Sequence, residues 1–171
     1  MGRKIKTPAR DIVTYWAQRE DECGLGVDWA EALERCWRCG YEARLERCHI
    51  VPHSLGGLDE PANLVLLCYR CHREAPNHCN PEYMWIWLRK NHRPFYDTYW
   101  THRGLEEYEK LFDRKLFEGV DPEAGSAELA QTVLKEEMAR ATIHYGQAHL
   151  NPVTMACVMR EAELRLLAMI E

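Results

Sequence analysis

Long apolar runs are missing from this chain. Its 171 residues contain no stretch of about 18 consecutive apolar residues, the length that a membrane-spanning helix requires. The basic N-terminus, Met-Gly-Arg-Lys-Ile-Lys-Thr-Pro, is not followed by the apolar region of a secretory signal. We therefore expect a soluble, cytoplasmic protein that does not act in a membrane.

A strongly basic character is also missing. The net charge is −5, and the acidic excess lies in residues 104–171, whereas residues 1–103 are close to neutral. This balance argues weakly against a nucleic-acid binder that relies on a broad positive field, but it leaves room for local contacts to phosphate. The first ten residues form a basic arm that is either a solvated terminus or a DNA-touching segment: Arg3, Lys4, Lys6 and Arg10.

Cysteine, by contrast, is plentiful and patterned. Four of the eight cysteines form two Cys-x-x-Cys pairs, Cys36 with Cys39 and Cys68 with Cys71. This spacing favours a tetrahedral zinc site over a disulfide framework, and redox or free thiols are the alternative. Four thiolates leave no open coordination position, so we predict a structural Zn²⁺ that holds a small core together.

Apolar periodicity and turn residues predict an α+β protein. We expect helices over about 8–20, 29–36, 71–75, 80–90, 103–118, 127–145 and 151–170, and strands over 45–51 and 64–67. Thr7 is expected to cap the first helix. The predicted organisation is an N-terminal helical segment with a basic arm (1–30), a core (31–93) and a C-terminal helical region (94–171) for packing or dimerisation.

Between the cysteine pairs the chain carries a recognisable order of residues. Cys48-His49-Ile-Val-Pro52 is followed by Gly56-Gly57, then by Asn63-Leu-Val-Leu-Leu-Cys68, and finally by Cys71-His72. This order, over about residues 33–75, resembles the HNH endonucleases of the ββα-metal nuclease superfamily. The resemblance implies a small zinc-stapled ββα-metal core embedded in a mainly α-helical chain, and an origin in a bacterium or phage.

The resemblance also implies roles for individual residues. His49 would be the general base, Asn63 would shape the catalytic loop and His72 would bind a catalytic Mg²⁺ or another divalent ion. Cys48 stands where many of these nucleases carry the first ligand of that ion, and a thiol is a poor ligand for magnesium. Further ligands are left open among water and four side chains: His53, Glu74, Asn77 and His78.

The function that follows is metal-dependent hydrolysis of DNA phosphodiester bonds to 5′-phosphate and 3′-hydroxyl ends. Three arginines near the predicted strands and helix are candidates for contacts with DNA: Arg47, Arg70 and Arg73. The C-terminal helices are candidates for a homodimer or partner-protein interface. Two other interpretations stay open, a non-catalytic zinc module that binds nucleic acid or protein, and an RNA-directed or nicking version of the same chemistry.

Overall fold

The structure is a computed structural model that describes residues 5–90, 97–120, 126–145 and 150–170. Arg3 and Lys4 of the predicted basic arm lie outside these ranges. The chain forms two compact units, Met1–Tyr99 and Trp100–Glu171. The predicted boundary at residues 30 and 31 stays a prediction.

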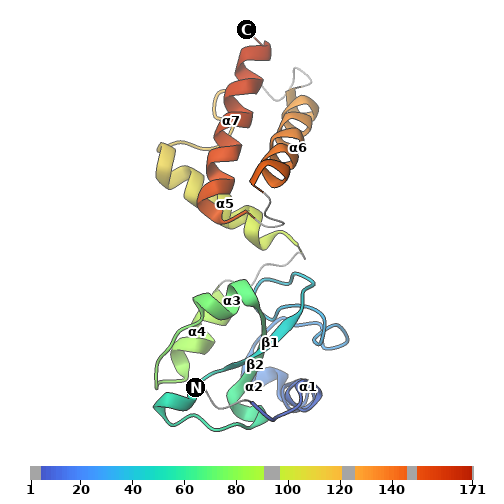
Figure 1. The fold of residues 1–171 in the computed structure, drawn as a ribbon, viewed down its shortest axis with the longest axis vertical. Helices are drawn as coiled ribbons and strands as arrows, with labels where there is room; N and C mark the ends of the chain where they lie inside the picture. The colour runs from blue at the N-terminus through green and yellow to red at the C-terminus, as the bar shows by residue number, and fades with distance from the viewer. Residues whose placement is uncertain (1–4, 91–96, 121–125, 146–149, 171) are drawn as a thin grey trace. The chain divides into compact units, whose positions relative to one another are not determined.

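The first unit contains a two-stranded sheet and short helices (Figure 1). In chain order its elements are α1 (Ala9–Ala17), α2 (Glu20–Cys23), β1 (Leu45–His49), η1 (His53–Leu55), η2 (Pro61–Asn63), β2 (Leu64–Cys68), α3 (Tyr69–Glu74) and α4 (Glu82–Lys90). The predicted α+β class and the ββα order of β1, β2 and α3 are confirmed.

The hairpin of β1 and β2 places the residues of interest at its two ends. The strands pair antiparallel, with Leu45 opposite Cys68 at one end and His49 opposite Leu64 at the other. All five residues of β2 are buried, as expected of a short, wholly apolar strand. The hairpin thus carries a cysteine at one end and His49, next to Asn63, at the other.

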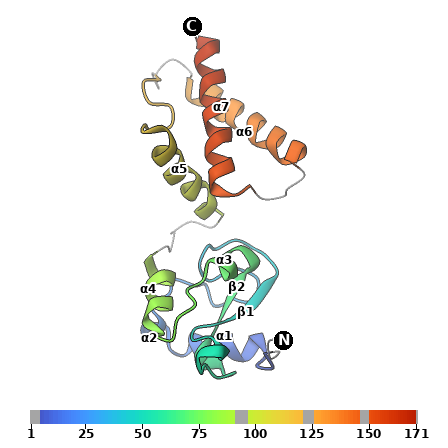
Figure 2. The same cartoon turned by 60° about the vertical axis from the view of Figure 1, so that its left-hand side comes forward.

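Helix α1 covers this hairpin (Figures 1 and 2). Its apolar positions recur at helical spacing, which buries Ile12 and Trp16 on one face. The Trp16 indole donates a hydrogen bond from Nε1 to the carbonyl oxygen of Leu64 at 2.9 Å. The Trp85 ring of α4 packs edge-on against Trp16, with ring centroids 4.8 Å apart. The two helices and β2 therefore share one core.

Two local predictions are wrong. Residues 29–34 form consecutive turns instead of a helix, because the Asp28 side chain accepts the amide of Ala30 and Arg35 pairs with Glu42 in an isolated bridge. Thr7 does not cap α1, whose N-cap residue is Pro8. The hydroxyl of Thr7 instead donates to the backbone carbonyl of Asp59.

The second unit is built from three helices, α5 (Tyr99–Phe112), which begins at the unit boundary, α6 (Ser126–Tyr145) and α7 (Pro152–Ile170). Gly104 of α5 lets the helices approach closely, because a Cβ there would lie 2.6 Å from Sδ of Met155 on α7. Glu163 of α7 is fully buried and accepts hydrogen bonds from the Tyr108 hydroxyl and from the amide of Phe117 at 2.9 Å. No helix in the described ranges is both long and apolar enough to span a bilayer.

The apolar residues of α7 are only partly buried. Met155, Met159 and Leu166 are in the core, whereas Val153 and Leu164 are about half exposed. An interface on these helices stays a prediction.

Candidate metal centre and active site

Four cysteines from two separate turns meet at one end of the hairpin. Cys36 and Cys39 lie on the turn before β1, Cys68 is the last residue of β2 and Cys71 lies in α3. The first turn is closed by a hydrogen bond from the amide of Gly40 to the carbonyl oxygen of Cys36 at 2.9 Å, with Gly40 at a φ of 72°. All four thiols are buried, and their sulfur atoms lie within 4.8 Å of one another.

The spacing of these sulfur atoms fits a structural zinc site. Sγ of Cys39 lies 3.8 Å from Sγ of Cys68, which matches the edge of about 3.8 Å in a tetrahedron with Zn–S bonds of about 2.3 Å. A disulfide would require a separation of about 2.05 Å. Hydrogen bonds from the neighbouring thiols, first from Cys36, lower the pKa of Cys68 far below its ordinary value. Burial and the closed arrangement leave no position for a substrate, so an ion here would hold the fold.

Arg38 secures the first cysteine turn to the helices. Its side chain is buried, and Nη1 donates to Oε2 of Glu74 in α3 at 2.8 Å. The guanidinium lies 3.6 Å from the ring centroid of Trp87 in α4. A charge buried in this way is compensated by an ion pair and an aromatic face, which ties three segments around the cysteines.

His49 ends β1 at the opposite end of the hairpin. Its Nε2 atom is buried and has no hydrogen-bond partner among the described residues. Burial lowers the pKa of His49 below its ordinary value, although the negative charge of Asp59 acts in the opposite direction. The imidazole is therefore neutral at pH 7, the form that can accept a proton.

Asn63 holds the loop between His49 and β2. Its amide nitrogen donates to the carbonyl oxygens of Val51 and Leu58, both at 2.9 Å, and its Oδ1 accepts the amide of Val51 at 2.8 Å. Gly57 lies inside this loop, where a Cβ would come within 1.7 Å of the Val51 carbonyl oxygen. These contacts give Asn63 a loop-shaping geometry, as the sequence resemblance implied, and they place its side chain on the backbone instead of on the His49 ring.

His72 lies in α3 and is paired with a carboxylate. Its Nδ1 atom is 2.6 Å from Oε2 of Glu46 on β1. Because a carboxylate only accepts hydrogen bonds, His72 carries its proton on Nδ1 and donates it to Glu46. Nε2 is then the nitrogen that can bind a metal ion, and a carboxylate behind a ligating histidine is the usual supporting arrangement.

Cys48 directly precedes His49 in the sequence but is poorly suited to bind a hard cation. Its side chain is only 4% exposed. Burial, together with the charges of Cys36 and Glu46, raises the pKa of the Cys48 thiol to about 12. A protonated thiol is a poor ligand for Mg²⁺, and a metal-binding role for Cys48 stays a prediction.

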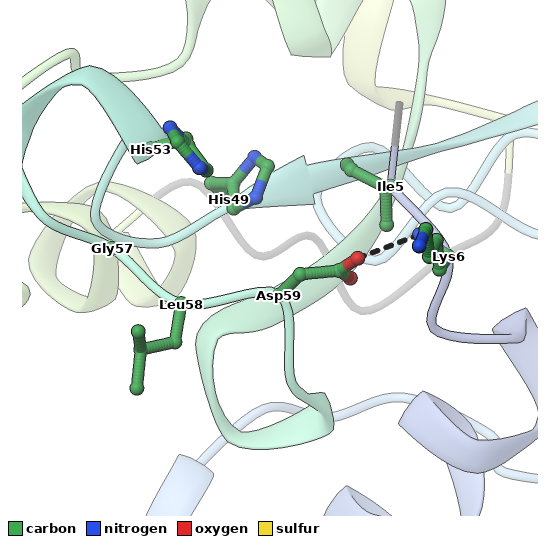
Figure 3. Close-up of a pocket in the computed structure, with 7 residues that line it drawn as sticks. All are labelled: Ile5, Lys6, His49, His53, Gly57, Leu58 and Asp59. Carbon is green, nitrogen blue, oxygen red and sulfur yellow. Dashed lines mark hydrogen bonds between the residues drawn. The ribbon is translucent and has the colours of Figure 1, made fainter. Parts of the chain in front are cut away.

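Two hollows meet at His49. One, of about 350 Å³, is lined by Cys48, His49, His53, His72 and Arg73, among others. The other, of about 170 Å³, is lined by His49 and His53 together with the N-terminal segment and the loop before η2 (Figure 3). The first hollow brings His49 and His72 to one space, and their roles as general base and metal ligand stay predictions.

The family model of the HNH endonucleases matches residues 34–77, the part of the chain that contains these cysteines and histidines. The match covers about a quarter of the chain and contains the four cysteines, His49, Asn63 and His72. The resemblance inferred from the residues is therefore confirmed for this HNH segment. No curated protein and no solved structure matches the chain.

The three arginines predicted to contact nucleic acid lie within the HNH segment but have different neighbours. Arg73 lines the larger hollow and donates from Nη1 to the Tyr69 hydroxyl at 2.7 Å. Arg70 is half-buried, and burial lowers its pKa while the nearby Cys68 raises it. Arg47 donates from Nη1 to the carbonyl oxygen of Thr7 at 3.0 Å. Arg73 is thus the arginine placed beside the histidines, and the DNA-binding role of all three stays a prediction.

Two residues of the HNH segment were not singled out from the sequence. Glu46 lies two residues before Cys48 and therefore on the same side of β1, but the sequence carries no signal that this side meets His72. Asp59 follows the Gly56-Gly57 turn and contacts residues more than fifty positions away, for which the sequence carries no signal. His53, one of several open candidates for metal binding, lines both hollows.

Proposed function

We propose that this protein is a metal-dependent endonuclease that hydrolyses phosphodiester bonds of DNA at the larger hollow. The observation that carries the proposal is the shared space of about 350 Å³, lined by a neutral His49 and by His72 with its Nδ1 atom bonded to Glu46. The HNH match supports a nuclease-type or nucleic-acid-binding module, and the arrangement of side chains favours the nuclease.

His49 would act as the general base. Its Nε2 atom is covered by protein, so we assign the imidazole proton to Nε2 and the accepting lone pair to Nδ1. A water molecule in the hollow would lose its proton to Nδ1 as its oxygen attacks the phosphorus atom. Asn63 keeps the following loop in shape through Val51 and Leu58, and so preserves the position of the ring.

His72 would hold a divalent ion through Nε2, with water and phosphate oxygens as the remaining ligands. Glu46 fixes the ring and its tautomer, and the hollow leaves room for those oxygens. When bound, the ion would supply a Lewis acid that stabilises the charge on the phosphate and on the leaving oxygen. Arg73, on the same hollow, would add a positive charge beside the phosphate.

A plasmid-cleavage assay with Mg²⁺, Mn²⁺ or Ni²⁺ tests the proposal. We expect His49→Ala to reduce the cleavage rate by about 10²- to 10⁴-fold, the usual effect of losing a general base. His102→Ala, an exposed histidine of α5, is the matched control and should cleave like the wild type. Equal rates for the wild type and His49→Ala would refute the enzymatic role.

The second candidate is a non-catalytic zinc module that binds nucleic acid. It is favoured by one observation, the protonated thiol of Cys48 at a place where many HNH nucleases carry a metal ligand. The same assay separates the two functions, because a binding module would retain DNA in a gel-shift experiment and leave the plasmid intact with every metal.

A further inference from the structure

The N-terminal segment Ile5–Thr7 is fastened beside His49 by one carboxylate. Oδ2 of Asp59 accepts the amide of Lys6 at 2.7 Å, and Oδ1 accepts the amide of Thr7 at 3.2 Å. The Thr7 hydroxyl donates to the carbonyl oxygen of Asp59 at 3.1 Å, and Arg47 of β1 binds the carbonyl oxygen of Thr7 at 3.0 Å. Four hydrogen bonds thus fix this extended segment on the HNH core, although it precedes the matched residues.

The fastened segment forms one wall of the smaller hollow. Ile5 and Lys6 line it together with His49 and His53, and Figure 3 shows the Asp59 carboxylate directed toward Lys6. Its volume is about 170 Å³. Since His49 and His53 line both hollows, this space is continuous with the surroundings of the proposed phosphate site.

The charges of this wall suit a second phosphate group. The Asp59 carboxylate is engaged by backbone donors, first by the amide of Lys6, which lower its pKa and keep it ionised. The Lys6 side chain is exposed, and its ammonium group makes no ion pair with any described residue. Because the backbone of Lys6 is fixed, its unpaired positive charge stays within a side-chain length of the hollow, where it suits a backbone phosphate.

We propose that Lys6 binds a phosphate of the nucleic-acid backbone next to the one that is cleaved, and that Asp59 positions Lys6 for this contact. The inference rests on the proposed nuclease function and adds a substrate-binding residue from outside the HNH segment. Lys6 is a binding residue in this scheme, and Asp59 acts through it as a positioning residue.

The test measures DNA binding by the full chain in a His49→Ala background, which prevents cleavage. Fluorescence anisotropy with a labelled duplex, repeated over a salt series, gives the slope of log Kd against log salt concentration. We expect Lys6→Ala to reduce that slope by about one and to weaken binding about five- to tenfold at 0.1 M salt. Lys6→Arg should retain the slope, and the exposed lysine of α6 in Lys135→Ala is the matched control.

The Asp59→Ala variant tests whether Asp59 acts by positioning Lys6 or only through its own negative charge. Removing a negative charge near a phosphate would by itself tighten DNA binding. If Asp59 holds Lys6 in place, the variant should instead bind several-fold more weakly, with a reduced salt slope and little further loss in the Lys6→Ala/Asp59→Ala double variant. Zinc content and thermal melting are measured in parallel to show that the core stays folded.

Two results would overturn the inference while leaving the nuclease intact: an unchanged slope in Lys6→Ala, or tighter binding in Asp59→Ala. A wild-type chain that neither binds nor cleaves DNA would refute the proposed function itself, and the inference with it.

Discussion

Glu46→Gln changes the partner of His72 while keeping an oxygen of similar position. Nδ1 of His72 lies 2.6 Å from Oε2 of Glu46, a short, charge-assisted contact that fixes the ring and leaves Nε2 for a metal ion. The glutamine oxygen can still accept the Nδ1 proton, but the negative charge that makes the ring a better donor to the metal is lost.

The expected loss of metal affinity in Glu46→Gln follows from the solvent exposure of the His72 and Glu46 side chains. Loss of the partner of a ligating histidine costs about 10- to 100-fold in metal affinity. The two side chains are 38% and 43% exposed, so solvent screens the charge and the low end applies. We expect about tenfold weaker metal binding in Glu46→Gln, or about 1.4 kcal/mol, and a larger loss in Glu46→Ala.

Titration of Mn²⁺ into zinc-loaded protein, followed by electron paramagnetic resonance or calorimetry, measures this directly and needs no catalytic turnover. Glu161→Gln, an exposed glutamate of α7, serves as the matched control. An affinity for Mn²⁺ that is the same in Glu46→Ala as in the wild type would show that His72 does not depend on Glu46, and would contradict the assigned tautomer and role.

Three further predictions concern the zinc site, the loop and the base. Cys39→Ser should lose tightly bound zinc and the cooperative unfolding of the first unit, as checked by metal analysis and circular dichroism; a folded, zinc-free variant would refute the structural role. Gly57→Ala should abolish cleavage and destabilise the loop, because its Cβ would overlap the Val51 carbonyl oxygen, 1.7 Å away; a fully active variant would contradict this. The value of kcat/KM should fall as the pH decreases, with this acid limb at lower pH than an ordinary histidine would give, because burial lowers the pKa of His49 and only the neutral ring accepts a proton. In Asp59→Asn that limb should move to lower pH, since the Asp59 charge raises the His49 pKa against the lowering effect of His53 and His72; a shift to higher pH would show that the sign is wrong.

The cysteine site and the hairpin could be predicted from the sequence because their signals are local. Each Cys-x-x-Cys pair fixes two sulfur atoms on one turn, and the apolar run of residues 64–67 between polar turns predicts a buried strand. The predicted helix over 29–36 is wrong because competing short-range contacts replace it. The Asp28 side chain accepts the amide of Ala30, and Arg35 and Cys36 pair with Glu42 and Tyr41 to form the knuckle of the metal site.

The partners of His72 and Lys6 could not be predicted in the same way. Glu46 meets His72 across 26 residues, and Asp59 meets Lys6 across 53. Each contact depends on how the hairpin, α3 and the N-terminal segment pack, and many acidic residues of the chain have the same local surroundings in sequence. The sequence shows which residue types are available for the chemistry, whereas the packing decides which carboxylate forms a hydrogen bond with which residue.

The pairing of β1 with β2 links the two ends of the hairpin, which lie apart from each other. Leu45 lies opposite the zinc-site residue Cys68, and His49 lies opposite Leu64, within one ladder of five residue pairs. A slip of one residue in this ladder would turn every side chain of β1 to the other face. Anything that frees Cys68 from the cluster, such as chelation or oxidation of the thiolates, would therefore loosen the alignment of His49 at a distance. The proposed nuclease activity should then depend on the redox state and the zinc concentration of the solution, although no zinc ligand takes part in the proposed reaction.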